Sequence, residues 1–336
     1  MKSIQIFKGE FNARIMNLRF GDTDIITPAY IPSLSSRHTP GFEPLFELLW
    51  PDIPLNMTLV SGFDAKSDIV SDAVSKGARG TRKLYLDTGS FEKKTCQTTD
   101  EERRDYLSIV HRISPDIVAI PDCTPQEDMD SSIDNQLTEM KRFTDNLKVP
   151  SALTLLFRMD GRWIAELALG RLVDAPAFKS MPPNVVGVIE EELGTSVLNR
   201  INALQALRNK LDGNGLRNVL IHVFGCSEPV SMALYSVAGA DLFDGTGWYR
   251  YAYRNDGLSR GDLSCLPLLE CDCAYCKDVN WRNIDRTEYL QRLALHDLCT
   301  IESYFKELRS RFMSSSVDAW LSRTSLRVVK KVLKDA

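Results

Sequence analysis

Eight short runs of apolar, mostly β-branched residues recur along the chain, and each run is continuous rather than alternating. Continuous apolar runs of this length are typical of strands covered on both faces, as in a parallel sheet. The runs lie at residues 26–34, 55–63, 83–91, 116–124, 150–157, 184–193, 218–225 and 240–245. Each is therefore predicted to be a buried strand.

Helix-like segments separate the runs. The segment 99–113 begins with Thr99 as a cap, carries acidic residues in its first turn and places its apolar residues on one face. A second segment over 196–215 ends in glycines, and a third leads from Glu228 into the last run. Repeated strand–helix alternation predicts an α/β fold, a (βα)8 TIM barrel, with an open doubly wound sheet as the alternative.

Acidic residues follow several of the predicted strands. They are Asp87, Asp122, Asp244 and the run Glu190–Glu192. In a (βα)8 barrel the carboxyl ends of the strands meet at one rim, where the chemistry is found. A single aspartate after a strand is often only a cap or a turn former, but several at one rim indicate a carboxylate-lined site.

Aromatic and basic residues interleave directly after the last predicted strand. Trp248 and Tyr249 precede Arg250, and further tyrosines and arginines follow over 251–260. Aromatic rings stack on bases and guanidinium groups pair with phosphates, so this pattern favours a nucleic-acid contact. The alternative is a wall of packed aromatic rings with solvated arginines.

Three of the eight cysteines, Cys271, Cys273 and Cys276, lie within six residues, followed by His296 on a long amphipathic helix. Three thiolates and one imidazole suit a tetrahedral structural Zn²⁺. Cys299 is the competing fourth ligand, and an iron–sulfur cluster is a second alternative that usually needs a fourth cysteine.

Composition is that of an ordinary globular protein, with 336 residues, 43% hydrophobic and 26% charged. No run approaches the roughly 18 apolar residues of a membrane helix, and no apolar leader is present, so we expect no membrane contact and a cytoplasmic protein. The net charge of −4 hides an uneven distribution, because residues 281–336 contain 11 basic and 7 acidic residues. A final amphipathic helix is predicted over 316–334.

The motifs together resemble the tRNA-guanine transglycosylase superfamily. The residues that carry the resemblance are TPAYIPS (27–33), LYLDTGSFE (84–92), DIVAIPDCTP (116–125), HVFGCSEP (222–229), ADLFDGTGWYR (240–250) and CDCAYC (271–276) with the downstream His296. The resemblance implies a barrel with N-terminal strands over 1–262 and a zinc-binding subdomain with C-terminal helices over 263–336. It also implies exchange of guanine in a polynucleotide for a free 7-deazaguanine base of the preQ0 type.

By position, the resemblance makes Asp244 the nucleophile that forms a covalent glycosyl-enzyme and Asp87 the general acid and base. It assigns the structural zinc to the cysteine cluster with His296. The residues expected to contact the substrate base and its neighbouring nucleotides are Phe91, Asp122, Glu191, Gly225, Trp248 and Arg250.

Several segments depart from the family pattern. Thr88 and Ser90 flank the glycine after Asp87 where Ser-Gly-Gly is usual, Arg158 stands where a glutamine is expected, and Glu190–Glu192 replaces Gly-Gly-Leu. The catalytic pair is kept while the substrate contacts diverge, and we expect no further RNA-binding domain after the cysteine cluster. DNA is therefore favoured over tRNA as the substrate, with tRNA as the alternative.

Two other hypotheses about the function remain. The chain could be a non-catalytic nucleic-acid-binding subunit or an unrelated barrel hydrolase. The partners expected are nucleic acid and the free base, with a second copy of the chain or an accessory ATPase as open alternatives.

Overall fold

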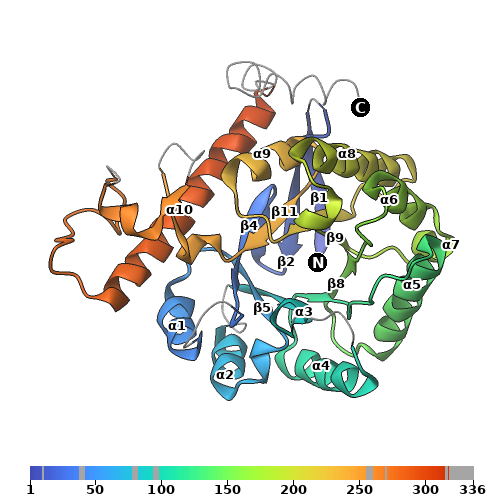
Figure 1. Ribbon diagram of the computed structural model, residues 1–336, viewed down its shortest axis with the longest axis horizontal. Helices are drawn as coiled ribbons and strands as arrows, with labels where there is room; N and C mark the ends of the chain where they lie inside the picture. The colour runs from blue at the N-terminus through green and yellow to red at the C-terminus, as the bar shows by residue number, and fades with distance from the viewer. Residues whose placement is uncertain are drawn as a thin grey trace.

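The structure, a computed structural model, describes residues 1–9, 11–37, 42–77, 82–93, 98–254, 260–268, 271–314 and 317. Parallel strands close into a barrel in the order β10-β11-β4-β5-β6-β7-β8-β9 (Figure 1). The strands are β4 (Ala29–Leu34), β5 (Met57–Ser61), β6 (Lys83–Asp87), β7 (Ile117–Ala119), β8 (Ala152–Phe157), β9 (Val185–Ile189), β10 (Leu220–Phe224) and β11 (Leu242–Gly245). The eight predicted strands and the (βα)8 barrel are confirmed, and the open sheet is excluded.

Helices surround the barrel (Figure 1). They are α1 (Phe42–Leu49), α2 (Asp68–Gly77), α3 (Ser90–Lys93), α4 (Asp100–Ile113), α5 (Met129–Asn146), α6 (Ala165–Asp174), α7 (Pro176–Ser180), α8 (Val197–Gly213), α9 (Pro229–Val237) and α10 (Arg286–Met313). Short 3-10 turns are η1 (Trp50–Asp52), η2 (Asp64–Lys66), η3 (Glu190–Leu193), η4 (Gly247–Tyr249) and η5 (Leu263–Leu268). The expected cap of α4 is confirmed, because Thr99 and Glu102 form a reciprocal capping box.

A small antiparallel sheet closes the N-terminal end of the barrel. It consists of β1 (Lys2–Lys8), β2 (Arg14–Phe20) and β3 (Thr23–Ile26). Apolar side chains of β2 and β3 join the cluster that fills the barrel interior. Arg14 and Asp241 are both buried and form a bidentate ion pair, with Nε–Oδ1 2.7 Å and Nη2–Oδ2 2.6 Å. This pair ties β2 to the segment that enters β11.

The segment after β11 leads through β12 (Tyr251–Tyr253) and β13 (Arg260–Asp262), which pair antiparallel, to the long helix α10. The apolar stripe of α10 packs into the main core, where the rings of Phe243 and Phe305 stack with centroids 5.9 Å apart. The cysteine-rich segment before α10 projects to one side of the barrel (Figure 1). The division of the chain at 262/263 stays a prediction.

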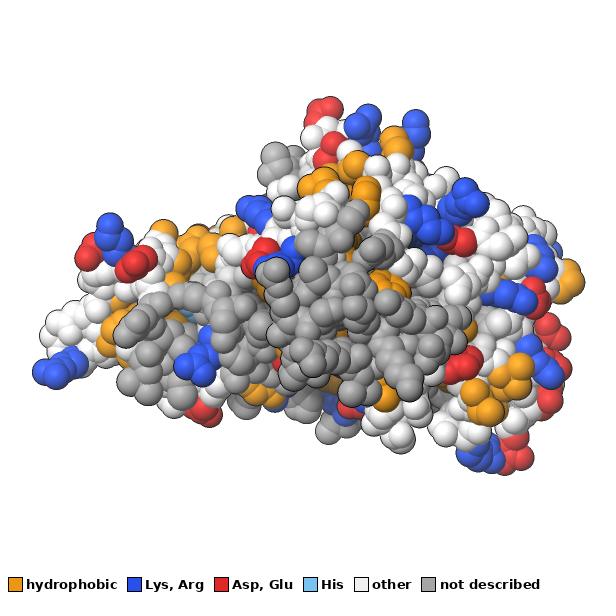
Figure 2. Space-filling model, turned by 90° about the horizontal axis from the view of Figure 1, so that it is seen from above, with side chains coloured by type: hydrophobic (Ala, Val, Ile, Leu, Met, Phe, Trp, Pro, Cys, Tyr) orange, Lys and Arg blue, Asp and Glu red, His pale blue; other side chains and the backbone are white. Residues whose placement is uncertain are grey.

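The surface carries both signs of charge. On the face shown in Figure 2, basic and acidic side chains occur in small mixed groups. Among the described residues, no helix is both long enough and apolar enough to cross a membrane. The final helix predicted over 316–334 lies outside the described residues, except for Val317.

Candidate active site and metal centre

The acidic side chains predicted at the strand ends lie at one rim of the barrel. Asp87 is the last residue of β6, Asp122 follows β7, and Asp244 lies in β11. Because all barrel strands run parallel, their carboxyl ends share this rim. The predicted location of these three carboxyl groups is thereby confirmed.

Hydrogen-bond donors surround the Asp244 carboxylate, whose residue is 6% exposed. Oδ2 accepts a hydrogen bond from Ser33 Oγ at 2.5 Å, and Oδ1 accepts one from the Gly225 backbone N–H at 3.0 Å. His222 Nε2 approaches Oδ1 to 3.3 Å. Gly225 has φ of +77°, a left-handed conformation that glycine adopts readily and that directs its N–H to the carboxylate. The hydrogen bonds from Ser33 and Gly225 therefore fix the orientation of the Asp244 side chain.

Asp87 has the opposite surroundings. Its pKa is raised to about 8, chiefly because burial penalises the charged form and further because Asp122 and Glu92 are nearby. Its Oδ1 is buried with no hydrogen-bond partner among the described residues, while Oδ2 accepts a long bond of 3.4 Å from the Gly89 N–H. A carboxyl group with this pKa is mostly protonated at neutral pH and can donate a proton.

Arg158 forms ion pairs with acidic residues at the ends of two strands, Asp122 and Glu192. These ion pairs were not predicted from the sequence. Its Nη1 donates to Asp122 Oδ2 at 3.0 Å, and its Nε and Nη2 lie 2.9 and 2.8 Å from Glu192 Oε1. Thr88 Oγ1 donates to the other oxygen of Asp122 at 3.0 Å. Asp122 is 2% exposed, so these partners fix its orientation at the rim. The presence of arginine at position 158, where the family pattern has glutamine, was the sequence feature that could have indicated this ion pair.

The remaining predicted base contacts differ in exposure. Phe91 on α3 is 46% exposed, and the Arg37 guanidinium lies 4.1 Å from its ring centroid. Glu191 is exposed on η3, beside Glu190, which bonds Arg200 and Tyr235 on the outer helices. Their roles in base binding stay predictions.

The interleaved aromatic segment is mostly core, and this corrects the expectation for Trp248. Its side chain is fully buried, and its Nε1 donates to the Ser33 carbonyl at 3.0 Å. Tyr249 and Tyr253 are buried as well. A ring without exposed surface cannot stack on a nucleotide, whereas Arg250 is exposed. Over the described residues 248–254, the alternative of packed aromatic rings with solvated arginines therefore applies.

Cys271, Cys273, Cys276 and His296 form a group that could hold a metal ion, with all ligand atoms within 4.8 Å of one another. His296 Nδ1 lies 3.4, 3.6 and 3.4 Å from the three Sγ atoms in chain order. His296 Nε2 faces the Tyr253 carbonyl at 2.8 Å, which leaves Nδ1 as the ligand atom. Among the described residues, this set does not include Cys299.

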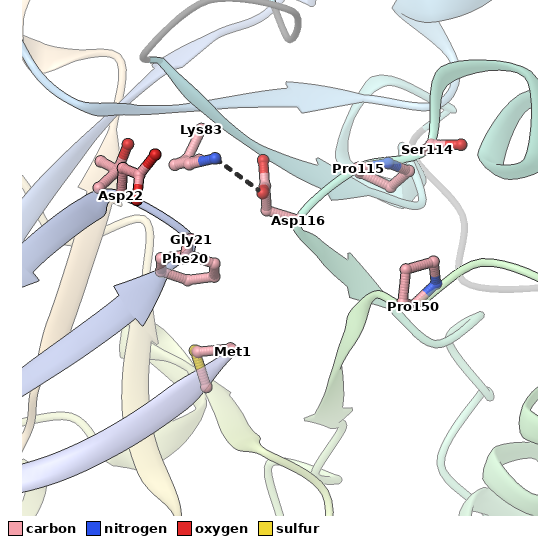
Figure 3. A pocket seen from close by; sticks show the side chains of 10 residues that line it. Met1, Phe20, Gly21, Asp22, Lys83, Ser114, Pro115, Asp116 and Pro150 are labelled. Carbon is pink, nitrogen blue, oxygen red and sulfur yellow. Dashed lines mark ion pairs between the residues drawn. The ribbon is translucent and has the colours of Figure 1, made fainter.

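A pocket of about 730 Å³ lies at the other end of the barrel (Figure 3). It is lined by the turn between β2 and β3 and by residues that begin β6 and precede β7 and β8, including Lys83 and Asp116, whose charged atoms are 3.5 Å apart. The strand starts lie far from the carboxylate rim in a parallel barrel, so this pocket is separate from the candidate active site.

Fold and site define the class of protein, which is a (βα)8 barrel with a carboxylate-lined mouth and a Cys3His group formed by the segment before α10 and by α10 itself. Curated relatives confirm the resemblance to the tRNA-guanine transglycosylase superfamily. The chain is 24% identical over 248 residues to the tRNA-guanine(15) transglycosylase of Methanopyrus kandleri. The aligned region covers 70% of this chain and 52% of the relative. The chain is 23% identical over 315 residues to that of Pyrococcus furiosus, which covers 88% and 52%.

A shorter match of higher identity links the chain to the tRNA-guanine(15) transglycosylase of Methanococcus maripaludis, with 32% identity over 90 residues, which are 24% of this chain and 14% of the relative. The chain spans about half the length of the Methanopyrus and Pyrococcus furiosus relatives. No protein-family model matches it.

Proposed function

We propose that this protein exchanges guanine in a polynucleotide for a free 7-deazaguanine base, with retention at the sugar. The observation that carries the proposal is the contrast between two carboxyl groups on one rim. Asp244 is surrounded by hydrogen-bond donors, whereas Asp87 has a pKa of about 8 and neighbouring carboxylates. One is suited to nucleophilic attack and the other to proton transfer.

The proposed reaction has two displacements. In the first, an oxygen of Asp244 attacks C1′ of the target nucleoside, the C1′–N9 bond breaks, and its electron pair leaves with guanine. Asp87 gives its proton to the departing base, which leaves as neutral guanine. In the second, the incoming base returns a proton from N9 to Asp87 and its N9 attacks C1′, which frees Asp244. Two inversions give retention.

Base recognition is assigned to the carboxyl groups beside Asp87. Guanine and its 7-deaza derivatives present N–H donors along one edge, and carboxylate oxygens accept from such donors. Asp122, held by Thr88 and Arg158, is the proposed acceptor. A base within a duplex is out of reach, so the target nucleotide must be extruded or single-stranded.

tRNA is the proposed polynucleotide, because the curated relatives are named as tRNA-guanine(15) transglycosylases. DNA is the second candidate. It is favoured by the replacement of expected base-contact residues with the Arg158–Glu192 ion pair, which changes the rim that meets the substrate.

The metal is proposed to be a structural Zn²⁺. Tetrahedral zinc with bonds of about 2.3 Å to sulfur and about 2.05 Å to nitrogen places nitrogen and sulfur ligands about 3.5 Å apart. The distances of 3.4 to 3.6 Å from His296 Nδ1 to the three Sγ atoms fit that geometry. Four protein ligands leave no open position for catalysis, so the ion would fix the segment between β13 and α10.

A parallel incorporation assay tests the proposed function. The purified protein is incubated with labelled guanine or a labelled 7-deazaguanine and with tRNA, single-stranded DNA or duplex DNA. Label is expected to enter tRNA. Entry into DNA alone would select the second candidate, release of guanine without incorporation would indicate a hydrolase, and no reaction would favour a non-catalytic subunit. Asp244→Asn is the control for chemistry at the proposed nucleophile.

A further inference from the structure

His222 is a buried imidazole beside the proposed nucleophile. It lies on β10 and is 0% exposed. The distance between its Nε2 and Asp244 Oδ1 is 3.3 Å. Nε2 forms no hydrogen bond of ordinary geometry among the described residues. The opposite ring nitrogen, Nδ1, lies 3.2 Å from the Tyr85 hydroxyl. The imidazole thus lies between the proposed nucleophile Asp244 and strand β6. That strand carries Tyr85 and, two residues later, Asp87.

The ring of His222 is fixed by its packing. It lies against Phe224 with centroids 3.9 Å apart and an interplanar angle of 30°, and against Tyr85 at 5.3 Å. The Tyr85 hydroxyl in turn lies 2.6 Å from Thr154 Oγ1, and both of these residues are fully buried. The polar groups Thr154, Tyr85, His222 and Asp244 therefore form one continuous chain inside the apolar barrel.

The charge of Asp244 decides where the imidazole carries its proton. A lone pair on Nε2 would lie 3.3 Å from a carboxylate oxygen and repel it, whereas an N–H at Nε2 would be attracted to that oxygen by its charge. Burial raises the pKa of Tyr85 well above its ordinary value, so its hydroxyl keeps a hydrogen that can be donated to Nδ1. Donation from Tyr85 to Nδ1 leaves the imidazole proton on Nε2.

We propose that His222 is a positioning residue for Asp244, a proposal that rests on the function proposed above. Its Nε2–H attracts Oδ1 electrostatically from 3.3 Å and the Gly225 N–H donates a hydrogen bond to the same oxygen, which leaves Oδ2, beside Ser33, as the oxygen that attacks C1′. In the glycosyl-enzyme, Oδ1 becomes the ester carbonyl oxygen. The Nε2–H then stabilises the negative charge that returns to this carboxylate when the second displacement breaks the bond between C1′ and Oδ2.

Enzyme kinetics test the proposal on the full-length, metal-loaded protein. His222→Leu is expected to lower kcat roughly 10- to 100-fold while KM for the free base changes little, because the donor acts on the carboxylate and not on the base. His222→Gln, whose amide N–H can reach the same oxygen, is expected to recover most of kcat. His111→Gln on the outer helix α4 is the matched control, with unchanged kcat. Wild-type kcat in His222→Leu would overturn the proposal.

A spectroscopic test does not depend on activity. Nitrogen-15 NMR of labelled histidine, with the His222 signals assigned by their loss in His222→Gln, is expected to show a proton on Nε2. A neutral imidazole protonated at Nδ1 would overturn the proposal even if the enzyme is active. If the wild type exchanges no base on any polynucleotide, the proposed function fails, while the tautomer still decides whether His222 donates to Asp244. Thermal unfolding and metal content identify a variant that fails to fold.

Discussion

The surroundings of each carboxyl group at the barrel rim determine the chemistry that it can perform. Burial and neighbouring carboxylates keep a proton on Asp87, and burial also raises the pKa of Asp64 and Glu92. Burial raises the pKa of Glu192 too, although its ion pair with Arg158 opposes the shift. Asp87, with its pKa of about 8, is the group that keeps a proton near neutral pH, which suits the proposed transfer of a proton between two purine-like bases.

Asp87→Asn is predicted to stabilise the protein increasingly as the pH rises. The folded pKa of about 8 lies above the ordinary value of 3.8, so wild type loses stability from about pH 4 to pH 8, where only the unfolded state is ionised. Asparagine does not titrate. The difference in Tm between variant and wild type should grow from pH 5 to pH 8.5 and then level off. A difference that shrinks over this range would contradict the raised pKa.

Arg158→Gln is predicted to weaken base binding more than turnover. The substitution removes the charge that pairs with Asp122 and Glu192, and the buried Asp122 keeps only its Thr88 partner of the two that fix its orientation. KM for the free base should rise at least about tenfold, since a charge-assisted hydrogen bond is worth roughly 1.5–3 kcal/mol. Arg171→Gln, in an exposed pair with Asp130, is the control. Equal KM values in wild type and Arg158→Gln would argue against Asp122 as the base acceptor.

Sequence reasoning at this scale found the acidic strand ends but not their partners. Asp87, Asp122 and Asp244 follow apolar runs, so their position on a barrel rim was predictable. The pairing of Arg158 with Asp122 and Glu192 depends on which strands are neighbours and on side-chain rotamers. His222 had a signal that was not used: it shares the inward face of β10 with Leu220 and Phe224, where a polar residue needs a partner.

At the scale of elements, the N-terminal sheet closes the barrel below the site. The link is the Arg14–Asp241 pair, in which Arg14 also donates to the carbonyls of Arg217 and Val219, and Asp241 accepts from the Ile221 N–H. A buried charge network of this kind orders the strands that lead to Asp244. Removal of one member leaves the other charge buried and unpaired.

Arg14→Met is accordingly predicted to lower the free energy of unfolding by about 3–5 kcal/mol, measured by urea denaturation. Lys8→Met is the control, because Lys8 is 48% exposed and its pair with Asp212 is worth at most about 1 kcal/mol. Similar losses in the two variants would show that the buried pair does not hold β2 to the barrel.

The helices and strands were predicted correctly where the pattern of apolar and polar residues is compatible with only one arrangement. Continuous apolar runs separated by amphipathic helices fit a parallel barrel, and the capping box of α4 was readable from Thr99 and the acids that follow. The aromatic–arginine segment had two solutions, stacking on nucleotides or packing in the core. The choice depended on α10, which contacts η4 and β12 and covers Trp248 and Tyr253. Sequence spacing alone does not report that long-range contact.

At the scale of the whole molecule, the Cys3His group that could hold a metal connects the end of the barrel to α10. His296 lies on α10, its Nε2 faces the Tyr253 carbonyl, and Asp297 accepts from the Tyr253 N–H at 2.8 Å. The cysteine cluster is therefore joined to β12 through two consecutive residues of the helix. Metal binding should stabilise the folded chain and not only its own loop.

Chelation is predicted to lower Tm, and the native protein should hold one zinc per chain by elemental analysis. Cys276→Ser should lose the metal and show the same lowered Tm. Cys299→Ser is the matched control and should keep the full metal content, because Cys299 lies outside the ligand set of the described residues. A metal-free protein with the Tm of the native one would contradict a structural role.

The most direct test of the central claim is capture of the covalent intermediate on Asp244. The protein is incubated with its polynucleotide substrate, denatured rapidly and examined by intact mass spectrometry and peptide mapping. The expected result is a protein–polynucleotide adduct on the peptide that contains Asp244, absent in Asp244→Asn and discharged when free 7-deazaguanine is added. Base exchange by Asp244→Asn at the wild-type rate, or an adduct on another residue, would contradict the assignment of Asp244 as the nucleophile.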